Sequence, residues 1–107
     1  MADVWGVLNQ SKPAATTLTD AYTCPASKHA TVEVVLCNVG SDSTVRMSHA
    51  IAGAANALSQ YYLYDFPLLA GESKVTVRIT LRATDVLRVY SNTGDVTFIT
   101  NGIEEDN

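Results

Sequence analysis

The sequence predicts an all-β protein: a single antiparallel β-sandwich domain, with either jelly-roll or immunoglobulin-like topology. Residues 74–81 alternate polar and apolar side chains one by one, which is the pattern of a half-buried strand. About seven or eight short runs of this kind follow one another with turn residues between them, as in known sandwiches. Helical spacing is limited to one short segment, so helices contribute little to the expected fold.

The chain has 107 residues, which suits one hydrophobic core and no second domain. Pro13 breaks the first segment, so we expect residues 1–15 to form an extended N-terminal arm. Residues 16–101 would form the sandwich, and the acidic residues 102–107 a frayed C-terminal tail.

The expected arm carries three large apolar side chains: Trp5, Val7 and Leu8. Trp5 either packs against its own domain or anchors the arm on a neighbouring chain, since tryptophan is favoured at interfaces. For an arm that reaches a neighbour, we expect a chain without residues 1–10 to remain folded but to bind that neighbour less tightly.

Strands are predicted in order along the first half of the chain. Residues 16–23 are rich in β-formers and end at a turn that begins with Cys24 and Pro25. Residues 30–38 form a strand that is covered on both faces toward its end, with Val32, Val34 and Leu36 on one face. After a loop over 38–43, the alternation resumes in residues 44–49, with Val45 and Met47 pointing inward.

The middle of the chain is harder to assign. Residues 50–58 combine helical spacing with small residues, so a short helix and an irregular connection both stay open. Residues 60–66 read as a strand with aromatic side chains on both faces, ended by Pro67.

The last third contains three β-rich runs, 74–81, 86–90 and 96–100. Their connections are short, so we expect an antiparallel meander, because parallel neighbours need a long crossover. In the first run, one face is predicted to hold Val75, Val77, Ile79 and Leu81.

Charge and composition exclude several partners. The net charge is −4 and the sequence pI about 4.8, so a phosphate backbone would be repelled and nucleic acid is not expected as a partner. The longest uncharged stretch, 47–64, is too polar to cross a membrane. The N-terminus lacks the pattern of a signal peptide, so Cys24 and Cys37 are expected to be reduced thiols without a zinc site.

No motif in the sequence proposes catalysis, a cofactor or a metal site, and we therefore expect no enzyme. His29 is expected in a turn facing solvent and His49 partly buried, with no nucleophile and carboxylate beside them in a known pattern. Asp65, Asp85 and Asp95 adjoin turns, where aspartate commonly bonds to nearby backbone.

The tyrosines are the other candidate surface residues. Alternation sends Tyr62 and Tyr64 to one face of their strand and Tyr61 to the other, so at least one ring should reach the surface. There it would suit a protein interface or stacking on a sugar.

The order of the segments resembles a family of small tailed-bacteriophage structural proteins, over most of the chain from Ser11 to Ile99. The segments that carry this resemblance are residues 11–19, 22–26, 30–38, 61–67 and 81–91. The resemblance supplies no functional residue, and residues 50–59 match it least.

The resemblance implies a non-enzymatic virion protein, made in the host cytoplasm, that binds other virion proteins. The first expectation is a capsid decoration (cement) protein that stabilises the shell, as a homotrimer bound to the major capsid protein. The alternative is a tail- or neck-associated protein, or a receptor- or sugar-binding module of the tail that uses Tyr61, Tyr62 or the 38–43 loop. The expected interface residues are Trp5, Val7, Leu8, Tyr61 and Tyr62.

Overall fold

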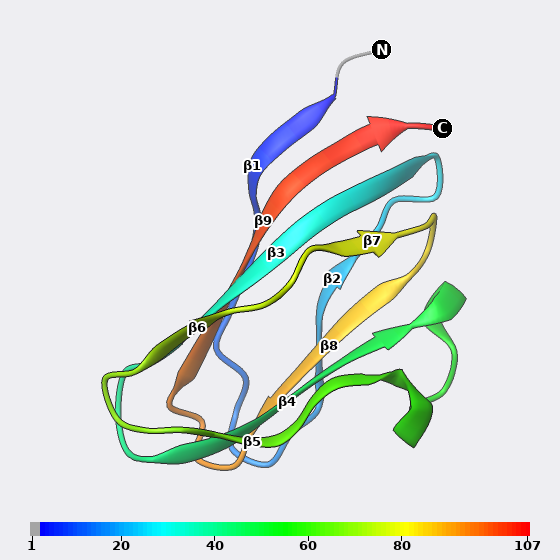
Figure 1. Cartoon of the computed structure of the whole chain (residues 1–107). Helices are drawn as coiled ribbons and strands as arrows, with labels where there is room; N and C mark the ends of the chain where they lie inside the picture. Colours follow the sequence, from blue (N-terminus) through cyan, green and yellow to red (C-terminus); the bar gives the residue numbers. More distant parts are fainter. Residues whose placement is uncertain (1–2) are drawn as a thin grey trace.

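A computed structural model describes residues 3–107 as two antiparallel β-sheets packed face to face, with no α-helix among those residues (Figure 1). In chain order, the strands are β1 (Val4–Ser11), β2 (Thr19–Thr23), β3 (Lys28–Asn38), β4 (Ser43–Ala50), β5 (Tyr61–Leu68), β6 (Ser73–Val75), β7 (Ile79–Leu81), β8 (Val86–Ser91) and β9 (Val96–Asp106). The predicted β-sandwich is therefore confirmed.

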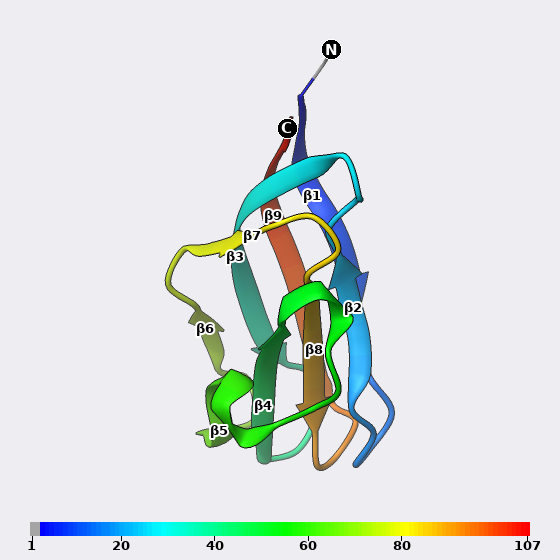
Figure 2. The same cartoon turned by 90° about the vertical axis from the view of Figure 1, so that its right-hand side faces the viewer.

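Strand order decides between the two predicted topologies. Sheet A has the order β1-β9-β3-β6, with β7 also paired to β3, and sheet B has the order β2-β8-β4-β5. If β6 and β7 are counted as one interrupted strand, sheet A has four strands, like sheet B. Each sheet contains strands from both halves of the chain (Figure 2). This is a jelly-roll order; an immunoglobulin-like sandwich would pair its first two strands.

The predicted meander at the end of the chain is wrong. β7 and β9 belong to sheet A, whereas β8 lies in sheet B between β2 and β4. The short connections cross between the sheets, which lie about 10 Å apart in such folds. This crossing lets Leu87 and Val89 of β8 meet Phe98 of β9 in the core.

The strand predicted over 74–81 is interrupted at Thr76, which is buried. The Thr76 N–H donates to the Val34 carbonyl oxygen (2.9 Å) and its Oγ1 accepts from the Val34 N–H (3.0 Å). Because this side chain turns inward, the alternation changes phase. Val75 and Val77 are exposed rather than sharing the inner face, while Ile79 and Leu81 are buried as predicted.

The predicted N-terminal arm is also wrong. Residues 4–11 form β1, antiparallel to β9, with Val4 opposite Glu104 and Ser11 opposite Phe98. A strand here satisfies the backbone groups of β9 that would otherwise form an open edge. The part of the expected arm at Met1 and Ala2 lies outside the described residues. Since Leu8 also packs against the core, a chain without residues 1–10 should lose stability.

Residues 102–106, where a tail was predicted, continue β9 between β1 and β3. Their carboxylates have partners that support an ordered strand. Tyr22 Oη donates to Glu104, and the Lys28 ammonium donates to Asp106 (2.9 Å). In Figure 1 the start of β1 and the end of β9 project beyond sheet B and lie at the same end of an elongated molecule.

The inward-facing residues predicted for β3 and β4 are confirmed. Val32, Val34 and Leu36 of β3 and Val45 and Met47 of β4 all lie in the core, as predicted. The connection over 50–60 is irregular, with two single turns of 3-10 helix at Ile51–Gly53 and Leu58–Gln60.

Candidate functional site

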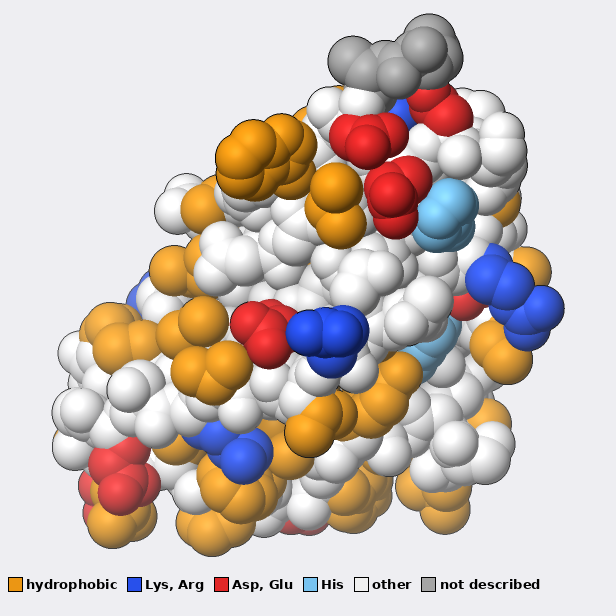
Figure 3. Space-filling model, turned by 45° about the horizontal axis from the view of Figure 1, so that its top comes forward, with side chains coloured by type: hydrophobic (Ala, Val, Ile, Leu, Met, Phe, Trp, Pro, Cys, Tyr) orange, Lys and Arg blue, Asp and Glu red, His pale blue; other side chains and the backbone are white. Residues whose placement is uncertain are grey.

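The outer face of sheet A, which points away from sheet B, is a candidate interaction surface. Its side chains alternate with the core residues of β3 and β9. Across the sheet, Val35 lies between Ile99 and Val75, and Trp5 lies opposite Ile103. Trp5 is 79% exposed and Val7 58% exposed. Figure 3 shows hydrophobic side chains in several patches on this side of the molecule, with acidic side chains gathered toward the top of the view.

A hollow lies on the same face, at the end of β1 opposite to Trp5. Its volume is about 380 Å³ and its walls are mainly apolar. The lining residues are Gln10, Ser11, Lys12, Thr97 and Ile99. Gln10 pairs with Ile99 in the register of β1 and β9, so the hollow and Trp5 share one strand and one face.

The edge of β1 is open. Among residues 3–107, β1 pairs with β9 and with no other strand. It is eight residues long and contains no charged residue and no proline, whereas such features usually protect a sheet edge from pairing with another chain. By contrast β5, at an edge of sheet B, contains Pro67 and bends at Asp65, where φ is 50°.

The predicted interface residues do not form a single site. Trp5 and Val7 lie on the outer face of sheet A, and Leu8 packs against the core. Tyr61 and Tyr62 belong to β5, in the other sheet. Tyr61 is half-buried and meets Tyr64 edge-on, with ring centroids 5.0 Å apart. Tyr62 is 44% exposed.

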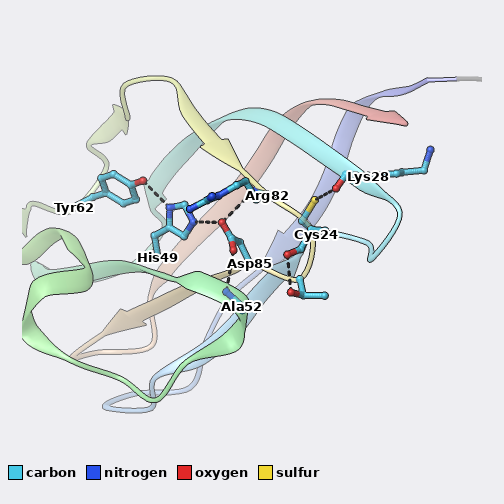
Figure 4. Close-up of polar contacts among 9 residues, drawn as sticks. Cys24, Lys28, His49, Ala52, Tyr62, Arg82 and Asp85 are labelled. Carbon is cyan, nitrogen blue, oxygen red and sulfur yellow. Dashed lines mark hydrogen bonds and ion pairs between the residues drawn. The ribbon is translucent and has the colours of Figure 1, made fainter. Parts of the chain in front are cut away.

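A second candidate lies in a polar cluster at one end of sheet B (Figure 4). Tyr62 Oη lies 2.8 Å from His49 Nδ1, and His49 Nε2 lies 2.8 Å from Asp85 Oδ2. Asp85 also accepts the backbone N–H groups of Ala52 (2.9 Å) and Arg82 (3.0 Å). The connectivity resembles a hydroxyl–imidazole–carboxylate triad.

The electrostatics of this cluster favour a structural role. Burial and the nearby Asp85 charge both raise the pKa of Tyr62, so its hydroxyl is not activated toward the phenolate. Burial pulls the Asp85 pKa upward, but the hydrogen bonds from Ala52, His49 and Arg82 outweigh it and lower the pKa. Asp85 is thus a fixed anion that ties β4 and the 50–60 connection to the turn before β8.

Sequence reasoning placed these three residues separately. It expected His49 to be partly buried, and its side chain is indeed 15% exposed. It expected Asp85 to bond nearby backbone, which the Arg82 contact confirms. Their meeting with Tyr62 had no local signal, because the three residues come from different strands or turns.

The remaining predicted polar residues have structural partners. Asp65 pairs with Arg46 (2.6 Å) rather than with its own backbone. Asp95 accepts the Ser41 N–H and hydroxyl, which lower its pKa and hold the 38–43 loop. His29 lies in β3 rather than in a turn, 3.5 Å from Glu105.

The described part of the chain contains no cluster of metal-binding side chains and no disulfide. Within residues 3–107, no group of three or more histidine, cysteine or acidic residues is placed to hold a metal ion. Cys24 and Cys37 are free thiols. None of the helical segments in the same residues is long and apolar enough to cross a membrane.

Comparison of the chain with protein-family models, with curated protein sequences and with solved structures gave no match.

Proposed function

We propose that this chain is a non-enzymatic structural protein of a tailed-bacteriophage particle, a capsid decoration protein that binds and stabilises the shell. Its partners would be the major capsid protein and further copies of itself. The observation that carries the proposal is the outer face of sheet A, where Trp5 and Val7 stand exposed beside an open strand edge.

Energetics favour a protein partner for this face. Burying one large apolar side chain contributes about 1.5–3 kcal/mol, so Trp5 and Val7 together offer roughly 3–6 kcal/mol per copy. Small contributions of this size become strong when many copies bind a repetitive surface at once. A shell of identical subunits provides such a surface.

The fold adds an argument by analogy. Jelly rolls occur in viral capsid domains and in lectins, and a rigid sandwich is suited to a particle component. Because one fold hosts many functions, the analogy is compatible with the proposal and does not replace the surface as its basis.

Quantitative mass spectrometry of purified particles tests the location. We expect copies of this chain to approach the number of major capsid subunits. A ratio of a few per cent or less would contradict the decoration role and place the chain in the tail or neck.

Binding to particles that lack the chain tests the surface. Trp5→Ala and Val7→Ala should each reduce occupancy, while Leu58→Ala should not, because Leu58 is equally exposed but lies on the 50–60 connection. Unchanged occupancy of the Trp5 and Val7 variants would contradict the assignment of this face.

A tail receptor-binding module is the second candidate, and a specific feature favours it. The Arg46 guanidinium lies over the Tyr64 ring (4.3 Å) and the Tyr90 ring (4.7 Å) on the surface of sheet B. Exposed aromatic rings beside charged groups suit stacking on a sugar. Specific binding on a glycan array, lost in Tyr64→Ala, would support this candidate over the decoration role.

A further inference from the structure

We propose that two copies of this chain pair through β1 as antiparallel neighbours, and that Trp5 of each copy enters the hollow beside Gln10 of the other. The inference rests on the proposed function, in which the chain binds further copies of itself. It deepens that proposal by naming the segment, the orientation and the symmetry of the contact. In the dimer Trp5 is buried between the two copies and supports shell binding by holding the dimer together, while Val7 stays on the outer face of sheet A for the shell.

The register follows from the ends of the strand. Setting Asp3 of one copy opposite Lys12 of the other places Trp5 opposite Gln10, and Val4 opposite Ser11. Opposed residues of an antiparallel pair point to the same face. Trp5 and Gln10 both lie on the outer face of sheet A, opposite Ile103 and Ile99, so this register brings the Trp5 ring over the hollow.

Knob and hollow are matched in character. Among residues 3–107, Trp5 is the most exposed of the large apolar side chains, and the hollow of about 380 Å³ has mainly apolar walls. The Lys12 side chain lines the hollow, where its ammonium can lie against the face of an entering indole ring. Trp5 and the hollow both lie on β1, so in the dimer each copy would place its Trp5 in the hollow of the other.

The charges on and beside β1 favour a second copy of the chain as the partner and an antiparallel orientation of the two strands. β1 contains no charged residue, so two copies can approach without repulsion along its length. Asp3 and Lys12 flank the strand with opposite charges, and the antiparallel pair sets them against each other at both ends. A parallel pair would oppose Asp3 to Asp3 and Lys12 to Lys12, which is unfavourable.

The backbone supports the same pairing. Alternate residues of an edge strand direct their N–H and C=O groups away from the sheet, and eight residues span about 26 Å of such an edge. The register of β1 with β9 shifts between Val7 and Asn9, and this bulge interrupts the alternation at Leu8. The two copies would therefore pair on either side of the bulge, over residues 4–6 and 9–11. The two sheets A would then form one continuous sheet across the dimer.

This contact has two-fold symmetry and closes at two copies. It therefore predicts a dimer in solution, in place of the homotrimer that the family resemblance implied. Sedimentation equilibrium of the full chain, without particles, measures this directly. A dimer is the expected result, and a monomer at high protein concentration or a trimer would overturn the inference.

Two variants test the knob. Trp5→Ala should raise the dimer dissociation constant at least tenfold, whereas Leu58→Ala, the matched exposed control, should leave it unchanged. Far-UV circular dichroism of each variant establishes that the sandwich is intact. A folded Trp5→Ala chain that dimerises like the wild type would overturn the inference.

A charge swap tests the register without altering the core. Asp3→Lys and Lys12→Asp should each weaken the homodimer by opposing like charges, and the double variant should restore it. Mixing the two single variants should give a heterodimer, because each Lys–Lys contact is replaced by a Lys–Asp contact. If neither the double variant nor the mixture recovers dimers, the antiparallel register is wrong.

These outcomes are separable from those of the proposed function. Dimerisation is measured on the isolated chain, and particle binding on particles that lack it. A wild-type dimer that fails to bind particles lacking the chain would contradict the decoration role while leaving the pairing intact. A monomer that binds particles would contradict the pairing and support the decoration role.

Discussion

Replacing Asp85 by Asn tests whether the polar cluster is a structural clamp. The Asp85 side chain is almost fully buried, and its two oxygens accept three hydrogen bonds, from His49, Ala52 and Arg82. An amide keeps one acceptor oxygen and turns an NH₂ group toward at least one of these donors.

The magnitude follows from these contacts. A hydrogen bond to a charged group contributes about 1.5–3 kcal/mol, and a buried donor left without an acceptor costs about 1–3 kcal/mol. We therefore expect Asp85→Asn to lower the free energy of unfolding by about 3 kcal/mol, which corresponds to a fall in Tm of about 12 °C or more.

Urea unfolding followed by circular dichroism measures this difference at pH 7. The control is Asp20→Asn, because the Asp20 carboxylate pairs with Arg88 (3.0 Å) but is largely exposed, and exposed pairs contribute about 0–1 kcal/mol. A loss below about 1 kcal/mol for Asp85→Asn would refute the clamp.

The difference in stability between wild type and Asp85→Asn should depend on pH. The folded state lowers the Asp85 pKa from its ordinary value of 3.8. The stability that this carboxylate contributes is therefore complete above pH 3.8 and is lost as the pH falls through the lower folded pKa. The difference between wild type and Asp85→Asn should be full at pH 7 and shrink below pH 3.8. A difference that stayed constant into strong acid would show that the charge is not involved.

Three further perturbations have expected outcomes. Deleting residues 1–10 should lower the free energy of unfolding by about 3 kcal/mol or more, because it uncovers the edge of β9 and removes Leu8 from the core; thermal unfolding at wild-type Tm would contradict this. Gly102→Ala should cost about 3 kcal/mol, since an added Cβ would lie 2.1 Å from the Thr31 carbonyl oxygen, and Asn101→Ala is its neighbouring control in urea unfolding. Tyr62→Phe should cost only about 1 kcal/mol by the same measurement, through loss of the His49 hydrogen bond, and a much larger loss would mean that the hydroxyl organises more than this contact.

The sequence predicted the strands whose two faces differ clearly. In β3 and β4, the alternation of Val32, Val34, Val45 and Met47 identified the buried face correctly, because a period of two is imposed by the backbone itself. The alternation also predicted the sandwich, since half-buried strands must pack against a second layer.

Alternation failed where a tertiary contact outweighed it. Thr76 turns inward to bond the backbone of Val34, which displaces Val75 and Val77 to the surface. The residues around Thr76 do not predict this inward turn, because its hydrogen-bond partner Val34 lies on another strand. The assignment of residues 1–15 to an arm failed for a related reason: whether an apolar segment joins a sheet depends on a vacant edge elsewhere, here that of β9.

The candidate surfaces divide in the same way. The sequence by itself determined the residue types: an uncharged segment over residues 4–11 with one tryptophan, flanked by Asp3 and Lys12, and a chain without a catalytic motif. Only the tertiary structure decided that Trp5 and the hollow near Gln10 share one face of one strand, and that His49, Tyr62 and Asp85 meet. The physical reason is that periodicity is a property of neighbouring residues, whereas strand order and register depend on contacts between segments far apart in the chain.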